Sequence, residues 1–112
     1  MELSKEISEK IEELRYIESN SQGLLMQKQN NQIELNEVTN ALEEVKKTSG
    51  DVYKVSSNIM IKAQKNEIIK ELEEKKKILM MKQDSIEKQE KIFDDKSEQL
   101  KKEINSEIAK KK

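Results

Sequence analysis

The chain has 112 residues, a formal net charge of −1 and no cysteine or histidine; 40% of its residues are charged and 3% are aromatic. This composition argues against an ordinary compact core, which draws on aromatic side chains for much of its buried area, and is typical of an elongated coiled coil. Because acidic and basic residues are balanced, and the usual zinc ligands and catalytic bases are missing, we expect no nucleic-acid binding, no enzyme activity and no cofactor.

Long uninterrupted helices are permitted, because the chain has no proline and only two glycines. No apolar run approaches the length that spans a membrane, and the residues from Met1 to Glu6 lack the apolar segment of a secretion signal. We therefore expect a cytoplasmic protein that forms a single domain over residues 1–112 and makes no membrane contact.

The first part of the chain predicts one helix over residues 2–48, because apolar residues recur there at helical spacing. A strict seven-residue series runs through Ile7, Leu14, Ser21, Lys28, Leu35 and Leu42. Its polar middle, rich in Asn and Gln, is interpreted as a flexible section of one helix, and a break near Gly23 is the alternative. Gly50 is expected to follow the helix as a C′ residue with positive φ.

The last part of the chain predicts a second helix over residues 67–110, with Asn66 as its N-cap residue. A heptad series runs through Leu72, Leu79, Ile86, Phe93 and Leu100, whereas the second seam position is mostly polar. Two arms of similar length joined by a compact turn should fold back antiparallel. Pairing the two series, from Leu42 with Leu72 to Leu14 with Leu100, keeps the sum of the paired residue numbers at 114.

Residues 51–63 are the only segment with β character, because two runs of strand-forming residues flank a turn sequence. Alternation in a hairpin places Val52, Lys54, Ile59, Ile61 and Ala63 on one face, and Tyr53, Val55, Met60 and Lys62 on the other. Both faces thus carry large apolar groups, and a hairpin this small is at best marginally stable alone. We expect an oligomer interface with hairpins of other chains, formed by Val52, Tyr53, Val55, Ile59, Met60 and Ile61.

The hairpin and the following helix contain four motifs of a known family: Val52-Tyr53-Lys54, Asn58-Ile59-Met60-Ile61-Lys62, Asn66-Glu67 and Ile86-Glu87-Lys88-Gln89-Glu90. They resemble the beta class of prefoldin subunits, of the archaeal type, and the resemblance extends over the whole chain. One departure is Ser57, where the family often has glycine. The left-handed turn residue is therefore expected at Asn58.

The resemblance implies a mainly α fold: a long antiparallel two-helix coiled coil with one β-hairpin between the helices, which oligomerises into a β-barrel. It also implies a hexamer of two alpha-class and four beta-class subunits. The tips of the coiled coils would hold unfolded polypeptides, here called clients, and pass them to a group II chaperonin without ATP. The alternative is a structural coiled-coil protein that dimerises or tethers, which would explain the arms but not the hairpin.

The free ends of the two arms carry six apolar residues: Leu3, Ile7, Ile11, Leu100, Ile104 and Ile108. Periodicity alone favours a role in closing the seam between the helices. Helix ends fray, however, because their last turns lack partners on one side, and frayed apolar residues can bind a non-native chain. Together with the resemblance, this makes the six residues candidate client-binding tips. Met26, Met80 and Met81 are expected to lie in or beside the seam.

Overall fold

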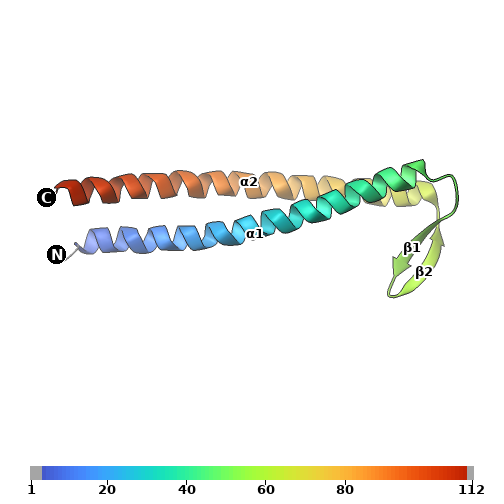
Figure 1. Ribbon diagram of the computed structural model, residues 1–112, viewed down its shortest axis with the longest axis horizontal. Coiled ribbons are helices and arrows are strands. Elements are labelled where there is room, and N and C mark those ends of the chain that lie inside the picture. The colour runs from blue at the N-terminus through green and yellow to red at the C-terminus, as the bar shows by residue number, and fades with distance from the viewer. Residues whose placement is uncertain (1–3, 111–112) are drawn as a thin grey trace. The chain divides into compact units, whose positions relative to one another are not determined.

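The computed structural model describes residues 4–110 and contains, in chain order, α1 (Lys5–Lys47), β1 (Val52–Ser56), β2 (Ile59–Ala63) and α2 (Lys65–Lys110) (Figure 1). Two long helices with an antiparallel hairpin between them confirm the predicted fold class. Contacts divide the chain into two compact units: the terminal unit, within Met1–Lys28 and Ser85–Lys112, and the hairpin unit, Gln29–Asp84. Across residues 4–110, neither helix is long and apolar enough to cross a membrane.

α1 is continuous through Gly23, so the polar middle of the helix contains no break. Its N-terminus is capped by Ser4, whose hydroxyl accepts a hydrogen bond from the Ile7 backbone N–H at 3.2 Å. This bond satisfies one of the first-turn N–H groups that have no partner within the helix. Glu6 lies in the same turn, where the helix dipole favours a negative charge.

The two helix ends next to the hairpin differ from the sequence predictions. Gly50 does not have a positive φ, so the expected glycine cap is wrong. Instead, the Lys65 ammonium donates to the carbonyl oxygens of Lys46 and Thr48, at 3.2 and 2.7 Å, and so satisfies carbonyls at the end of α1. α2 begins at Lys65, so Asn66 lies inside the helix and is not its N-cap residue.

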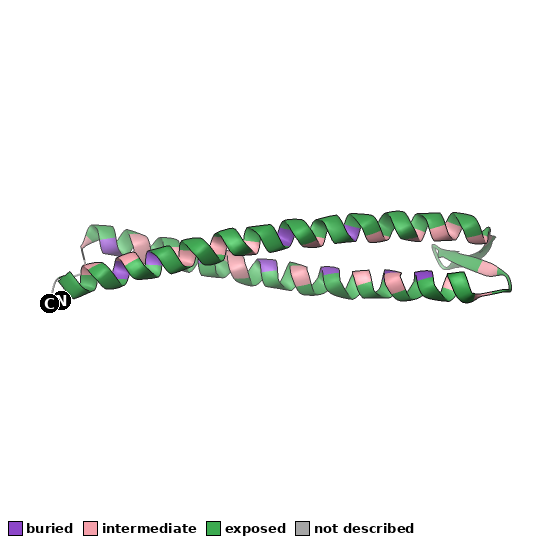
Figure 2. Ribbon diagram, turned by 90° about the horizontal axis from the view of Figure 1, so that it is seen from above, coloured by how far each residue is buried: buried purple, intermediate pink, exposed green. Residues whose placement is uncertain are grey.

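In the terminal unit, the two helices run side by side in opposite directions (Figure 1), and Figure 2 shows buried positions along both of them. The buried apolar residues of this seam are Ile7, Ile17, Leu24, Ile86, Leu100 and Ile104. Ion pairs border the seam: Lys28 Nζ lies 3.0 Å from Glu90 Oε1, and Lys101 Nζ lies 3.8 Å from Glu18 Oε1. A narrow apolar seam with charged borders is typical of a two-stranded coiled coil.

In the hairpin unit, the end of α1 and the start of α2 pack through Val38, Leu42 and Leu79, which are all buried. A fourth buried residue, Asn31, is polar and only 2% exposed. Its amide nitrogen donates to Gln83 Oε1 and to the Leu79 carbonyl oxygen, both at 2.9 Å. The numbers of Asn31 and Gln83 also add up to 114, in agreement with the predicted register. At Asn31 the polar middle of α1 is therefore packed against α2.

Candidate functional site

A two-residue turn determines the shape of the β-hairpin. β1 and β2 pair antiparallel with Ser56 opposite Ile59, so that Ser57 and Asn58 form the loop. Both loop residues have a positive φ, 48° for Ser57 and 68° for Asn58. A type I′ turn requires this at both central positions, and its twist matches that of the flanking strands. The left-handed residue expected at Asn58 is confirmed, and Ser57 adopts a left-handed φ without being glycine.

The register of the strands assigns each hairpin residue to one of two faces. Tyr53 pairs with Lys62 and Val55 with Met60, whereas Lys54 pairs with Ile61. Paired residues of antiparallel strands lie on the same side of a sheet, so the two faces are those predicted from the sequence. We name them the outer face (Tyr53, Val55, Met60 and Lys62) and the inner face (Val52, Lys54, Ile59, Ile61 and Ala63).

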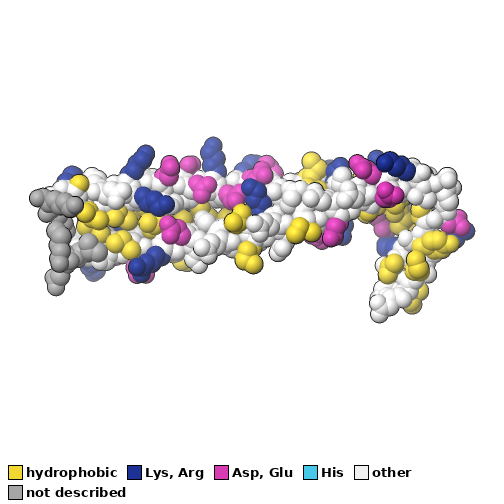
Figure 3. All heavy atoms as spheres, in the orientation of Figure 1, with side chains coloured by type: hydrophobic (Ala, Val, Ile, Leu, Met, Phe, Trp, Pro, Cys, Tyr) yellow, Lys and Arg dark blue, Asp and Glu magenta, His cyan; other side chains and the backbone are white. Residues whose placement is uncertain are grey.

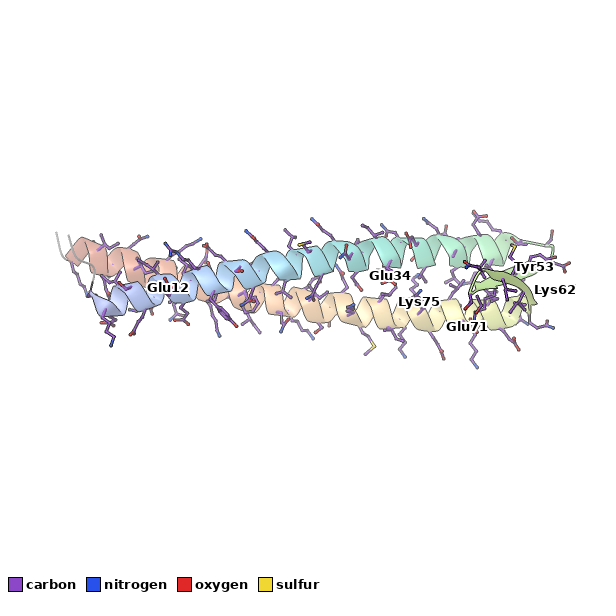
Figure 4. The ribbon with its side chains drawn as sticks, turned by 90° about the horizontal axis from the view of Figure 1, so that it is seen from below. Glu12, Glu34, Tyr53, Lys62, Glu71 and Lys75 are labelled. Carbon is purple, nitrogen blue, oxygen red and sulfur yellow. The ribbon has the colours of Figure 1, made fainter. Side chains whose placement is uncertain are left out.

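The inner face of the hairpin turns toward the start of α2. Val52, Lys54 and Ile61 line a groove of about 770 Å³ together with Ile68 and Glu71 of α2. Lys54 Nζ lies 3.0 Å from Glu71 Oε2 across this groove. Figure 4 shows Glu71 on α2 beside the hairpin strands. Because successive side chains of a strand point to opposite sides, the outer face points away from α2.

Five of the six residues predicted for an oligomer interface are 53–69% exposed, and Val52 is half-buried. The exposed residues are Tyr53, Val55, Ile59, Met60 and Ile61. Figure 3 shows hydrophobic side chains gathered along the projecting hairpin. We call these six residues the hairpin surface. A two-stranded sheet with open edges and apolar groups on both faces is a candidate for pairing with strands of other chains.

The second candidate site lies at the helix ends of the terminal unit. Ile7, Leu100 and Ile104 are buried in the seam, and Ile7 is the largest side chain that is fully enclosed in the described part of the chain. Ile11 is half-buried and Ile108 is exposed, whereas Leu3 lies outside the described residues. We call the five described residues the helix-end cluster. With the helices closed, most of this cluster is covered by the partner helix, so a client can contact it fully only after the helices separate.

A charged cluster that sequence reasoning missed surrounds Lys10 in the terminal unit. Lys10 Nζ lies 3.0 Å from Glu107 Oε1 and 3.6 Å from carboxylate oxygens of Glu103 and Glu6. The hydrogen bond to Glu107 is the main cause that raises the pKa of Lys10; burial opposes it, and the charges of Glu107, Glu103 and Glu6 add to it. The four-residue spacing of Glu6 and Lys10 was one signal of this cluster, but the partners on α2 depend on the register between helices.

The methionines and the acidic side chains of residues 4–110 were the remaining candidates for a chemical site. Met26, Met80 and Met81 are exposed, so these methionines lie beside the seam rather than in it. Within residues 4–110, no group of three or more Asp, Glu, His or Cys side chains is placed to hold a metal ion. The hairpin surface and the helix-end cluster are therefore the two candidate sites.

Known proteins match both the sequence and the fold. Residues 5–111 match the family model described as "Prefoldin subunit". The chain is 32% identical over 108 residues to the prefoldin subunit beta of Methanospirillum hungatei. This alignment covers 95% of this chain and 90% of that protein. It is 28% identical over 110 residues to the prefoldin subunit beta of Saccharolobus islandicus, with 96% and 87% covered. The crystal structure of the prefoldin beta subunit from Thermococcus strain KS-1 matches with a TM-score of 0.88, at 28% identity over 94% of each chain.

Proposed function

The chain belongs to the prefoldin family, as a beta subunit of the archaeal type, and we propose that it holds clients in the cytoplasm without ATP and delivers them to a group II chaperonin. Prefoldins are chaperones and not enzymes, and their beta subunits act within hetero-oligomeric complexes. The hairpin surface is the observation that carries this proposal, because a solitary coiled-coil protein has no use for a sheet that is apolar on both faces.

Assembly is the first part of the proposal: the hairpin surface joins four copies of this chain to two alpha-class subunits. Open strand edges supply backbone donors and acceptors, and the apolar side chains supply area to bury, so hairpins of several chains can close into a β-barrel. The inner face is partly covered by α2 and by the Lys54–Glu71 pair. The outer face, with Tyr53, Val55 and Met60, therefore offers the freer surface to a neighbouring hairpin.

The substitution Ile59→Asp tests this assembly, because it places a carboxylate among the apolar groups of the hairpin and leaves both helices unchanged. Mixed with an alpha-class subunit, the variant should form no hexamer by size-exclusion chromatography with light scattering, and its helical circular dichroism should match that of the parent. Met81→Asp is the matched control, because Met81 on α2 is 65% exposed and Ile59 is 61% exposed. A hexamer containing Ile59→Asp would contradict the proposed interface.

Client binding by the helix-end cluster is the second part. Its apolar groups become available when the helix ends separate, and terminal turns are the parts of a helix that open most easily. Each pair of ends binds weakly, and several pairs in one complex supply the affinity. Removing residues 1–11 and 100–112 should preserve the hexamer and weaken its protection of an aggregating client, measured by light scattering. Full protection by the truncated complex would count against binding at these ends.

A structural tether is the second candidate function, and it is favoured by the burial of Ile7, Leu100 and Ile104 in a closed seam. A tether needs no exposed apolar ends and no assembly through the hairpin. The native mass of a mixture with an alpha-class subunit separates the two functions. A monomer or dimer of this chain supports a tether, whereas a hexamer supports the chaperone subunit.

A further inference from the structure

A buried amide interrupts the apolar seam of the hairpin unit. Asn31 occupies the same heptad position of α1 as Leu24 and Val38, seven residues before and after it, and all three residues are buried. Burial of an amide is unfavourable unless its hydrogen bonds are made, so a leucine at this position would favour a more stable seam. A polar group that lowers stability at a seam position is commonly a device for pairing specificity.

The hydrogen bonds of Asn31 tie α1 to one turn of α2. Its amide nitrogen uses both N–H groups, one on Gln83 Oε1 and one on the Leu79 carbonyl oxygen, each at 2.9 Å. The two acceptors lie four residues apart, which is one helical turn. Asn31 Oδ1 has no partner within the described residues. Turning the amide over would place this oxygen against the two acceptors, so the contact also fixes the orientation of the side chain.

Exposed apolar side chains lie close to Asn31 and Gln83 along both helices of the hairpin unit. Ile33 on α1, and Ile78, Met80 and Met81 on α2, are each more than half exposed. Apolar groups beyond the seam widen the apolar surface of a coiled coil, and a wider surface favours bundles of three or four helices. The exposed apolar residues of this stretch could therefore pack against a further helix. A second copy of this chain would supply such a helix.

We propose that Asn31 and Gln83 keep this coiled coil two-stranded by making the addition of a helix from a second copy unfavourable. In the two-helix arrangement Gln83 is only half-buried, so its amide nitrogen still reaches water. A third helix would enclose the layer, take the Gln83 amide nitrogen out of water without a partner, and so add a second buried unsatisfied group to Asn31 Oδ1, which already lacks a partner within the described residues. The proposal concerns helix pairing and does not rest on client binding.

The double variant Asn31→Leu, Gln83→Leu tests the proposal in the full-length chain. Its unfolding midpoint, followed by circular dichroism, should rise by at least about 5 °C, because an apolar layer replaces a partly satisfied polar one. Native mass spectrometry over rising protein concentration should show masses above the largest seen for the parent. The control is Asn30→Leu, which adds a leucine at the neighbouring, exposed position of α1. This control should keep the masses of the parent.

Three results would overturn the proposal. The first is a double variant that shows only the masses of the parent. The second is an Asn30→Leu variant with the same additional masses, because the effect would then come from added surface apolarity. The third is loss of helical circular dichroism in the double variant, since the proposal requires the apolar layer to be at least as stable as the polar one.

Discussion

The substitution Ile17→Ala should increase client capture, although Ile17 is not part of the helix-end cluster. Ile17 is buried in the seam of the terminal unit. Truncating a buried isoleucine to alanine costs about 2–5 kcal/mol, and the narrow seam can relax, so we take the lower figure of about 2 kcal/mol. This corresponds to roughly a 30-fold larger opening equilibrium. Clients bind only the open state, so their apparent affinity is the intrinsic affinity multiplied by the fraction of open ends. The apparent client affinity should therefore rise by up to the same factor.

Ile7→Ala is the comparison that separates opening from binding. Ile7 is fully buried in the same seam, so its truncation also loosens the helix ends. It differs from Ile17→Ala because it removes a side chain of the helix-end cluster itself. Both variants would be assembled with alpha-class subunits and assayed for suppression of client aggregation by light scattering. Amide hydrogen exchange of the terminal unit would measure the opening independently. The Ile7→Ala complex should open as readily as the Ile17→Ala complex and capture less client than that complex.

Two outcomes would refute this reasoning. One is an Ile17→Ala complex whose amides exchange faster while its capture of clients stays at the level of the parent. The other is equal protection by the Ile17→Ala and Ile7→Ala complexes at equal opening. Either result would mean that the apolar residues at the helix ends only close the seam, as periodicity alone suggests.

Two further variants test ionic contacts. The pKa of Lys10 is raised above its ordinary value of 10.5, so its ion pairs stabilise the fold fully below that pH and are lost as the pH rises through the raised pKa. Between about pH 9 and pH 12 the parent should therefore lose more stability in thermal melts than Lys10→Met, with Lys5→Met as the control; equal losses would contradict this. Glu71→Gln removes the charged partner of Lys54; it should change global stability by at most about 1 kcal/mol, yet speed amide exchange in β1 and β2. Unchanged exchange would show that the pair does not hold the hairpin.

The two faces of the hairpin could be predicted from residues alone, because alternation along a strand has a period of two in any surroundings. Val55 and Met60 share a face for this reason, and the observed pairing confirms it. The continuous helices could be predicted for a similar reason: helical spacing and the absence of proline are properties of the local sequence.

Burial at the seam was harder to predict, because it depends on what the facing helix supplies. Asn31 lies in a polar stretch of the sequence, and only Gln83 and Leu79 across the seam give its amide partners. Glu107, the hydrogen-bond partner of Lys10, is 97 residues away along the chain. Gly50 is not a cap because α1 already ends at Lys47, three residues before it, where the Lys65 ammonium donates to the carbonyls of Lys46 and Thr48. The contacts of Asn31 and Lys10 were missed because they are tertiary, whereas the errors at Gly50 and Asn66 are shifts of helix boundaries by one to three residues.

Under the proposed function, the burial of Ile7 and Ile104 makes the partner helix and the client competitors for the same apolar groups. A seam that opens easily binds clients well but exposes apolar surface that promotes aggregation of the subunit itself. A seam that stays closed keeps the subunit soluble, but the apparent affinity for clients is then low because only a small fraction of the ends is open. Assembly through the hairpin surface removes this conflict, because several rarely open ends acting in one complex combine their weak affinities. The buried apolar seam then sets how often each end opens, and the hairpin surface sets how many ends act together.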